Sequence, residues 1–193
     1  ALRVNSSLKK ISLRYNSISD QGVFALASAL RENSSLSKLD LWGNSIGHEG
    51  ASVLADVLRV NMSLTELGLG DNDIEDEGVG ALADALRGNL SLTVLSLGYY
   101  KDVSAVGAMK LVEMLRYNVS LTQIVFCHDE LDEMELRMSE LARINREAPS
   151  PHAAYGLKVK LLLDSTHGSG EDAVSLALAG IDRFSESEHR WVI

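Results

Sequence analysis

The sequence predicts an α/β solenoid, in which short strands form one parallel sheet and helices cover its outer side. The first observation is a repeat: the motif Asn-x-Ser-Leu occurs five times, with spacings of 28, 28, 28 and 29 residues. Its copies begin at Asn5, Asn33, Asn61, Asn89 and Asn118. The second observation is a change of period within each unit, from alternating apolar residues to apolar residues at helical spacing. Stacked repeats of this kind mainly provide an extended surface for binding.

The first half of each unit predicts a short strand with one buried face. Its pattern is Leu-x-x-Ile/Leu-x-Leu-x-x-Asn-x-Ile, carried in unit one by Leu8, Ile11, Leu13, Asn16 and Ile18. The apolar centre has a period of two, which is the period of a strand. The asparagines that follow predict a structural ladder, in which each side-chain amide bonds backbone groups at the strand-to-loop bend. These residues are Asn16, Asn44 and Asn72.

The second half of each unit predicts a helix. In unit one a glycine, Gly22, precedes Leu26 and Leu30, and the same spacing returns in units two and three. Acids lie near the expected helix starts and arginines near the ends, which suits the helix dipole. One unit cannot bury enough apolar surface alone, so neighbouring units must stack.

These patterns resemble the leucine-rich repeat family, in its ribonuclease-inhibitor-like class of 28-residue units. The resemblance covers about residues 5–147. It implies a horseshoe with a parallel sheet inside and helices outside. It also implies a cytoplasmic scaffold that binds a protein partner through the concave repeat face, as ribonuclease inhibitors and NOD-like receptors do.

The repeat divides the chain into three parts. Repeats are expected over residues 1–147, as a partial unit at 1–4 and units starting at 5, 33, 61, 89 and 118. Residues 148–152 are expected to be a linker, and residues 153–193 an αβ tail or C-terminal cap. Because residues 1–5 match residues 57–61, the chain starts at the tail of a helix, and this uncapped end is a candidate surface for self-association.

The fourth and fifth units depart from the pattern. Unit four has one extra residue, and a bulge with Tyr99 and Tyr100 is expected to interrupt the asparagine column there. Unit five places Asp129 at the asparagine position. Such decay of the motif is typical of a terminal, capping unit.

The tail leaves two further functions open. Residues 157–163 predict a strand, and a glycine-containing loop and a helical pattern follow, which resembles the start of the Roc GTPase domain of Roco-type leucine-rich-repeat proteins. However, Glu171 and Asp172 stand where a phosphate-binding loop has Lys and Ser or Thr. A regulatory repeat segment of a Roco-type GTPase, with a degenerate or truncated nucleotide-binding start, is therefore one alternative, and a RanGAP-like GTPase-activating module is another.

A partner-binding patch is expected on the outward strand positions. Trp42 is its centre, because a large aromatic side chain there has no core behind it, and aromatic and arginine side chains dominate interface energetics. The patch is Arg14, Lys38, Asp40, Trp42, Glu66 and Tyr99.

Composition and the remaining motifs argue against other roles. The net charge of −9 and the lack of a basic stripe speak against nucleic acid, and no apolar run is long enough for a membrane span. The single cysteine fits a reducing, cytoplasmic compartment. Adjacent residues of the segment 127–130 point to opposite faces of a strand, so a catalytic Cys-His pair is not expected. The acids 75–77 fit a solvated helix start better than a calcium loop, and we expect no enzyme activity, cofactor or metal.

Overall fold

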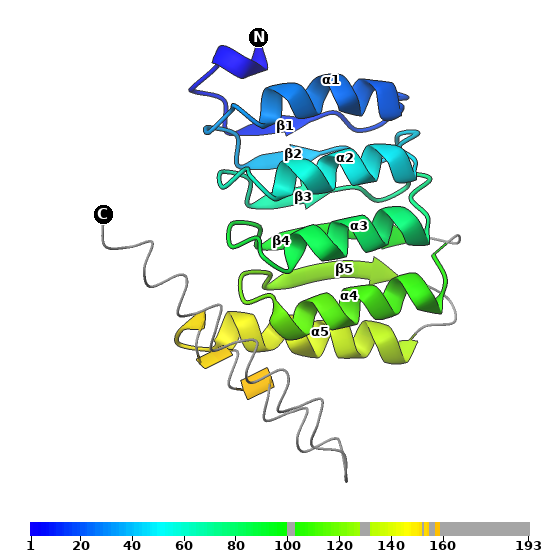
Figure 1. Cartoon of the computed structure of the whole chain (residues 1–193), viewed down its shortest axis with the longest axis vertical. Coiled ribbons are helices and arrows are strands. Elements are labelled where there is room, and N and C mark those ends of the chain that lie inside the picture. Colours follow the sequence, from blue (N-terminus) through cyan, green and yellow to red (C-terminus); the bar gives the residue numbers. More distant parts are fainter. Residues whose placement is uncertain (100–102, 128–131, 152, 155–156, 159–193) are drawn as a thin grey trace.

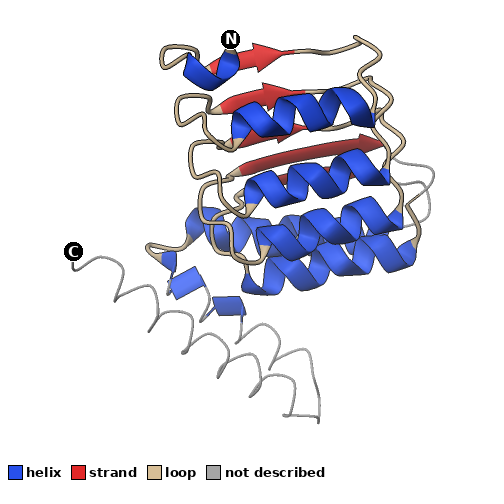
Figure 2. Cartoon of the chain, turned by 45° about the horizontal axis from the view of Figure 1, so that its top comes forward, coloured by secondary structure: helices blue, strands red, loops and turns tan. Residues whose placement is uncertain are grey.

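The computed structural model describes residues 1–99, 103–127, 132–151, 153–154 and 157–158 of the 193-residue chain. Strands and helices alternate along it, and the helices form a layer on one face of the sheet (Figures 1 and 2). The elements are η1 (Leu2–Val4), β1 (Lys10–Ser12), α1 (Asp20–Leu30), β2 (Lys38–Asp40), α2 (His48–Leu58), β3 (Glu66–Gly68), α3 (Asp76–Leu86), β4 (Val94–Tyr99), α4 (Ala105–Tyr117), β5 (Gln123–Cys127) and α5 (Asp132–Glu147). Within the described ranges this confirms the predicted α/β solenoid.

The sheet keeps the order of the sequence. Its described strands are parallel and follow one another as β1-β2-β3-β4-β5. Residues 28 positions apart are partners, so that Leu39 lies beside Leu67, and Leu67 beside Leu95. These three leucines are buried, because the alternating pattern turns them toward the helix layer. The open side of the sheet is therefore built from the residues between the leucines.

The irregularity of unit four lies earlier than the sequence suggested. The register between β4 and β5 shifts between Ser96 and Gly98, so Leu97 is the extra residue. Gly98 has a φ of 70°, a left-handed conformation that glycine adopts without a steric penalty. The bulge is thus taken up within β4, and residues 100–102 lie outside the described part of the chain.

The segment after α5 begins differently from the predicted strand. Ser150 accepts a hydrogen bond at Oγ from the backbone N–H of Ala153 (3.1 Å), and its carbonyl accepts one from Ala154 (2.9 Å). Pro151 follows the cap at the first helical position, where its missing N–H costs nothing. Leu157 and Lys158, the described residues of the predicted strand, are helical. Residues 159–193, including the glycine loop and its two acids, lie outside the described residues.

A search of the described helices for a membrane span gives a negative result: none combines the required length with the required apolar character.

Candidate functional site

The sheet face that points away from the helices, here called the open face, carries Trp42 as its largest side chain. Trp42 does not project freely from this face. A Cβ atom added to Gly70 would lie 2.2 Å from Cζ3 of the indole, and one added to Gly98 would lie 2.5 Å from Cη2. The ring therefore packs directly against the backbones of the next two units, and only glycine at both positions leaves room for it.

Arg14 stacks over the same ring from unit one. Its Cζ atom lies 5.2 Å from the centroid of the Trp42 ring and 5.8 Å from that of Tyr15. A guanidinium at this distance is attracted by the negative face of an aromatic ring. Nη1 of Arg14 also lies 3.5 Å from Oδ2 of Asp40, and Oδ1 of Asp40 accepts a 3.2 Å hydrogen bond from the backbone N–H of Trp42. We call Arg14, Asp40, Trp42, Gly70 and Gly98 the Trp42 stack.

The other predicted patch residues lie beside this stack. Lys38 and Glu66 form an ion pair across neighbouring strands. Both side chains are partly exposed, so the pair contributes little to stability. Tyr99 pairs with Cys127 through its backbone at the end of β4, and its side chain is outside the description. The structure thus brings Arg14, Asp40 and Trp42 into mutual contact and sets Lys38 and Glu66 next to them.

The asparagines after the strands join consecutive units. Oδ1 of Asn44 accepts hydrogen bonds from the backbone N–H groups of Asn16 (3.1 Å) and Ile18 (2.9 Å), and its Nδ2 donates to the carbonyl of Leu13 at 3.0 Å. Asn72 repeats the arrangement one unit later, toward Ile46 (3.1 Å) and Leu41 (3.0 Å). Asn16 instead donates to Arg14 of its own unit.

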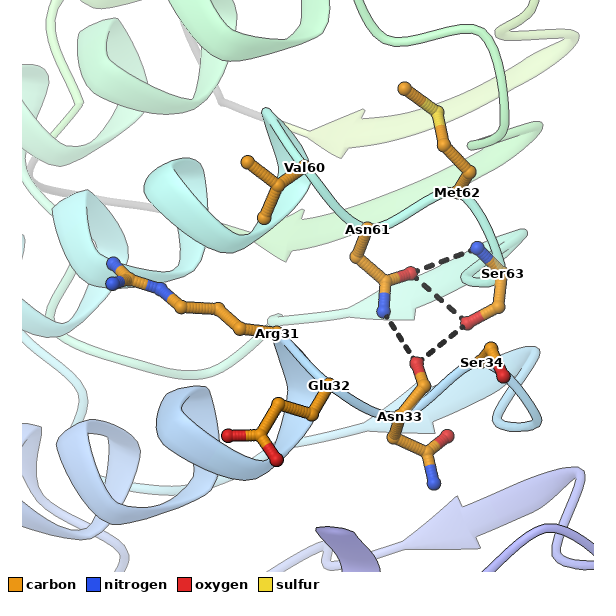
Figure 3. A pocket seen from close by; sticks show the side chains of 8 residues that line it. All are labelled: Arg31, Glu32, Asn33, Ser34, Val60, Asn61, Met62 and Ser63. Atoms are coloured by element: carbon orange, nitrogen blue, oxygen red, sulfur yellow. Dashed lines mark hydrogen bonds between the residues drawn. The ribbon is translucent and has the colours of Figure 1, made fainter.

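A second asparagine column, formed by the Asn-x-Ser-Leu motifs, has a role that sequence reasoning missed. In Figure 3, Nδ2 of Asn61 donates to the carbonyl of Asn33 (3.0 Å), while its Oδ1 accepts from Ser63. Nδ2 also donates to the carbonyl of Leu30 at the end of α1 (2.7 Å). Helix ends leave such carbonyls without partners, so this column satisfies them from the neighbouring unit. The fivefold recurrence of the motif was the signal, but the partner carbonyls lie in other units.

A pocket of ≈ 380 Å³ lies between the loops 31–34 and 60–63, on the edge of the array where helices lead into strands (Figure 3). Asn33, Asn61 and Ser63, which line it, bond one another. Since these polar groups are already satisfied, they do not point to a ligand.

The motifs weighed for metal or catalytic chemistry have structural surroundings. Within the described residues, no three His, Cys, Asp or Glu side chains form a group that could hold a metal ion. Asp76 accepts hydrogen bonds from the backbone N–H (2.8 Å) and the hydroxyl (2.5 Å) of Ser104, ahead of the next helix. Cys127 is exposed, and residues 128–130 lie outside the described part.

Parallel strands in sequence order, one helix per strand and asparagine columns between units define a solenoid of strand–helix repeats. A family model described as "Leucine Rich repeat" matches residues 4–27, 32–55 and 60–83. These three stretches of the chain are therefore leucine-rich repeats.

Solved structures show the same fold at low sequence identity. One, described as "Leiomodin-1 Actin-Binding Site 2 (ABS2)", has a TM-score of 0.71 and 21% identity, covering 76% of this chain and 86% of that one. Another, the tropomodulin C-terminal domain of Caenorhabditis elegans, has a TM-score of 0.65 and 20% identity, covering 76% and 89%. No curated protein matches the sequence significantly.

Proposed function

We propose that the chain is a cytoplasmic scaffold that binds a protein partner through the open face of its sheet, with the Trp42 stack at the centre of the contact. The observation that carries this proposal is a partly exposed indole held in place by its own surroundings. A few Trp, Tyr and Arg side chains supply most of the free energy of a typical interface. Because glycines and Arg14 already hold the Trp42 ring, binding would cost it little rotational freedom.

The charged side chains around the Trp42 stack would form the polar rim of the proposed interface. The pairs Arg14–Asp40 and Lys38–Glu66 place both signs beside the indole, and such groups orient a partner more than they tighten its binding. The proposed contact residues are Arg14, Lys38, Asp40, Trp42, Glu66 and Tyr99. The proposal assigns the chain binding alone, with no reaction, cofactor or metal.

Actin is the first partner to test, since the similar leiomodin structure is that of an actin-binding site. That property belongs to leiomodin, and the shared fold supports only the choice of experiment. Binding of monomeric actin to the immobilised full chain should be compared with binding to Trp42→Ala. Phe24→Ala is the matched control, because Phe24 is a partly exposed aromatic residue of α1, in the helix layer.

We expect Trp42→Ala to raise the Kd by about 30-fold, the effect of a hot-spot residue worth ~2 kcal/mol, and Phe24→Ala to leave the Kd unchanged. Circular dichroism of both variants should match the parent protein. Loss of binding in Phe24→Ala alone would move the contact to the helix layer. If the parent chain does not bind actin, actin is removed as a partner.

A further inference from the structure

Lys158 is fully buried, which is unusual for a lysine. Its Nζ donates to the carbonyls of Leu115 (2.6 Å) and Asn118, and the described residues give it no ion-pair partner. Desolvation by burial lowers its pKa from 10.5 to about 7. The proposed binding function makes no use of this group.

The two acceptors of Lys158 have equivalents in earlier units. Nδ2 of Asn33 donates to the carbonyls of Leu2 (2.8 Å) and Asn5 (2.9 Å), which are the equivalents of Leu115 and Asn118. The same type of pair is bonded by Asn61 and by Asn118, each time from the following unit. The ammonium of Lys158 therefore lies where the asparagine amide of a sixth unit would lie.

Asn145 of α5 takes the place of the serine that an Asn-x-Ser-Leu motif of a sixth unit would supply. In unit two, Oγ of Ser35 donates to the carbonyls of Asn5 (3.0 Å) and Leu8 (3.1 Å). Nδ2 of Asn145 donates to the equivalent carbonyls of unit five, which are those of Asn118 (3.1 Å) and Leu121 (2.7 Å). Two side chains from outside the motif thus supply the donors of both its Asn and its Ser.

We propose that Lys158 and Asn145 close the C-terminal end of the array, and that the described residues from Ser150 to Lys158 belong to a cap on the repeat body rather than to a linker. Solenoid ends need such closure, because the last unit has no neighbour to satisfy its polar groups. The cap starts at the hydrogen-bonded turn of Ser150, and Ala154 is buried on the way to Lys158. With its carbonyls occupied, this end is not available for stacking another repeat.

Hydrogen exchange of the full chain tests the cap. Lys158→Met keeps a long unbranched side chain but removes the donors. We expect the amides of residues 150–158 to exchange about tenfold faster in this variant, while α1 to α3 keep their protection. Lys9→Met is the matched control, because Lys9 is exposed and at the other end of the array. Unchanged exchange of residues 150–158 in Lys158→Met would overturn the proposal.

A double-mutant cycle tests the joint role of the two donors. Because Lys158 and Asn145 share the carbonyl of Asn118, removing either one leaves that acceptor a partner. Removing both leaves it none, so Lys158→Met with Asn145→Ala should accelerate exchange by more than the product of the single effects. If the acceleration in the double variant equals the product of the two single effects, the two side chains do not act jointly, and this would overturn the shared role.

Discussion

At the scale of the residue, the asparagines of the Asn-x-Ser-Leu motifs are joints between units. Asn89 is buried, and its Oδ1 accepts from the backbone N–H groups of Ser91 (3.0 Å) and Leu92 (2.8 Å). Its Nδ2 donates to the carbonyl of Leu58 at the end of α2 (2.8 Å). One side chain therefore satisfies backbone groups of two consecutive units.

Asn89→Ala should lower the free energy of unfolding by about 3 kcal/mol or more, because it leaves several buried backbone groups without partners at ~1–3 kcal/mol each. Urea unfolding measures this change. Asn16→Ala is the control, since Asn16 is exposed and, among the described residues, its side chain bonds only the carbonyl of Arg14 in its own unit. Equal losses in the two variants would contradict the role assigned to burial.

Gly70→Ala should displace the indole of Trp42, because the new methyl group would occupy the space of the ring. The fluorescence emission of Trp42, measured in a Trp191→Phe background, should shift to longer wavelength as the ring gains contact with water. Gly88→Ala is the control, because no atom lies within 4 Å of a Cβ added at Gly88. An unchanged spectrum in Gly70→Ala would mean that the ring is not held by the glycines.

At the scale of the element, the starts of α2 and α4 receive hydrogen bonds from an aspartate of the preceding unit. Asp20, the first residue of α1, accepts hydrogen bonds at Oδ1 from the backbone N–H groups of Gly47 (2.8 Å) and Gly50 (3.0 Å) at the start of α2. Asp76 of α3 does the same for Ser104, which precedes α4. A carboxylate at a helix start also suits the helix dipole.

Asp20→Ala should cost about 1–2 kcal/mol of stability, the usual effect of losing a helix cap. Asp84→Ala, at an exposed position of α3, should change stability by less than about 0.5 kcal/mol. Thermal unfolding of the two variants separates the cap from the simple loss of a negative charge. A similar loss of stability in both variants would mean that Asp20 acts only through its negative charge and not as a helix cap.

The strands and helices were predictable because their information is local. The period-two leucines and the helical spacing that follows them are read within one unit, as Leu39 and Leu54 show. The packing of Trp42 was not predictable in the same way, since it depends on glycines 28 and 56 residues further on. The strand predicted from Leu157 is wrong at its two described residues, because Leu157 and Lys158 are helical.

At the scale of the whole molecule, most of the contacts described above join neighbouring units, and the reach of Trp42 to Gly98, two units further on, is an exception. Sheet partners, asparagine columns and aspartate caps each connect one unit with the next. In such arrays the interfaces between units carry much of the stability. The two ends of the array therefore have a large influence on stability. The protonation state of Lys158 should accordingly change the stability of the molecule.

The stabilising effect of Lys158 should increase with pH. Burial lowers the pKa of Lys158 from 10.5 to about 7. At a pH between these two values, the side chain therefore loses a proton when it becomes buried in the folded chain. Stability from this group is therefore greatest above pH 10.5 and is lost as the pH falls toward 7, with a slope of at most ~1.4 kcal/mol per pH unit. The Tm of the parent chain, relative to that of Lys158→Met, should therefore rise as the pH is raised from about 6.5 to 9.5. A constant difference would mean that Lys158 docks with its proton.

The glycines beneath Trp42 also decide how the array can grow by duplication. A second copy of residues 61–88, placed directly after the first, would add another glycine beside Gly70 and leave room for the indole. A second copy of residues 33–60 would instead put a tryptophan where the first ring needs a bare backbone. Units of equal length are thus not interchangeable, because the unit that carries Trp42 cannot be repeated without placing a second indole where the first ring needs a glycine.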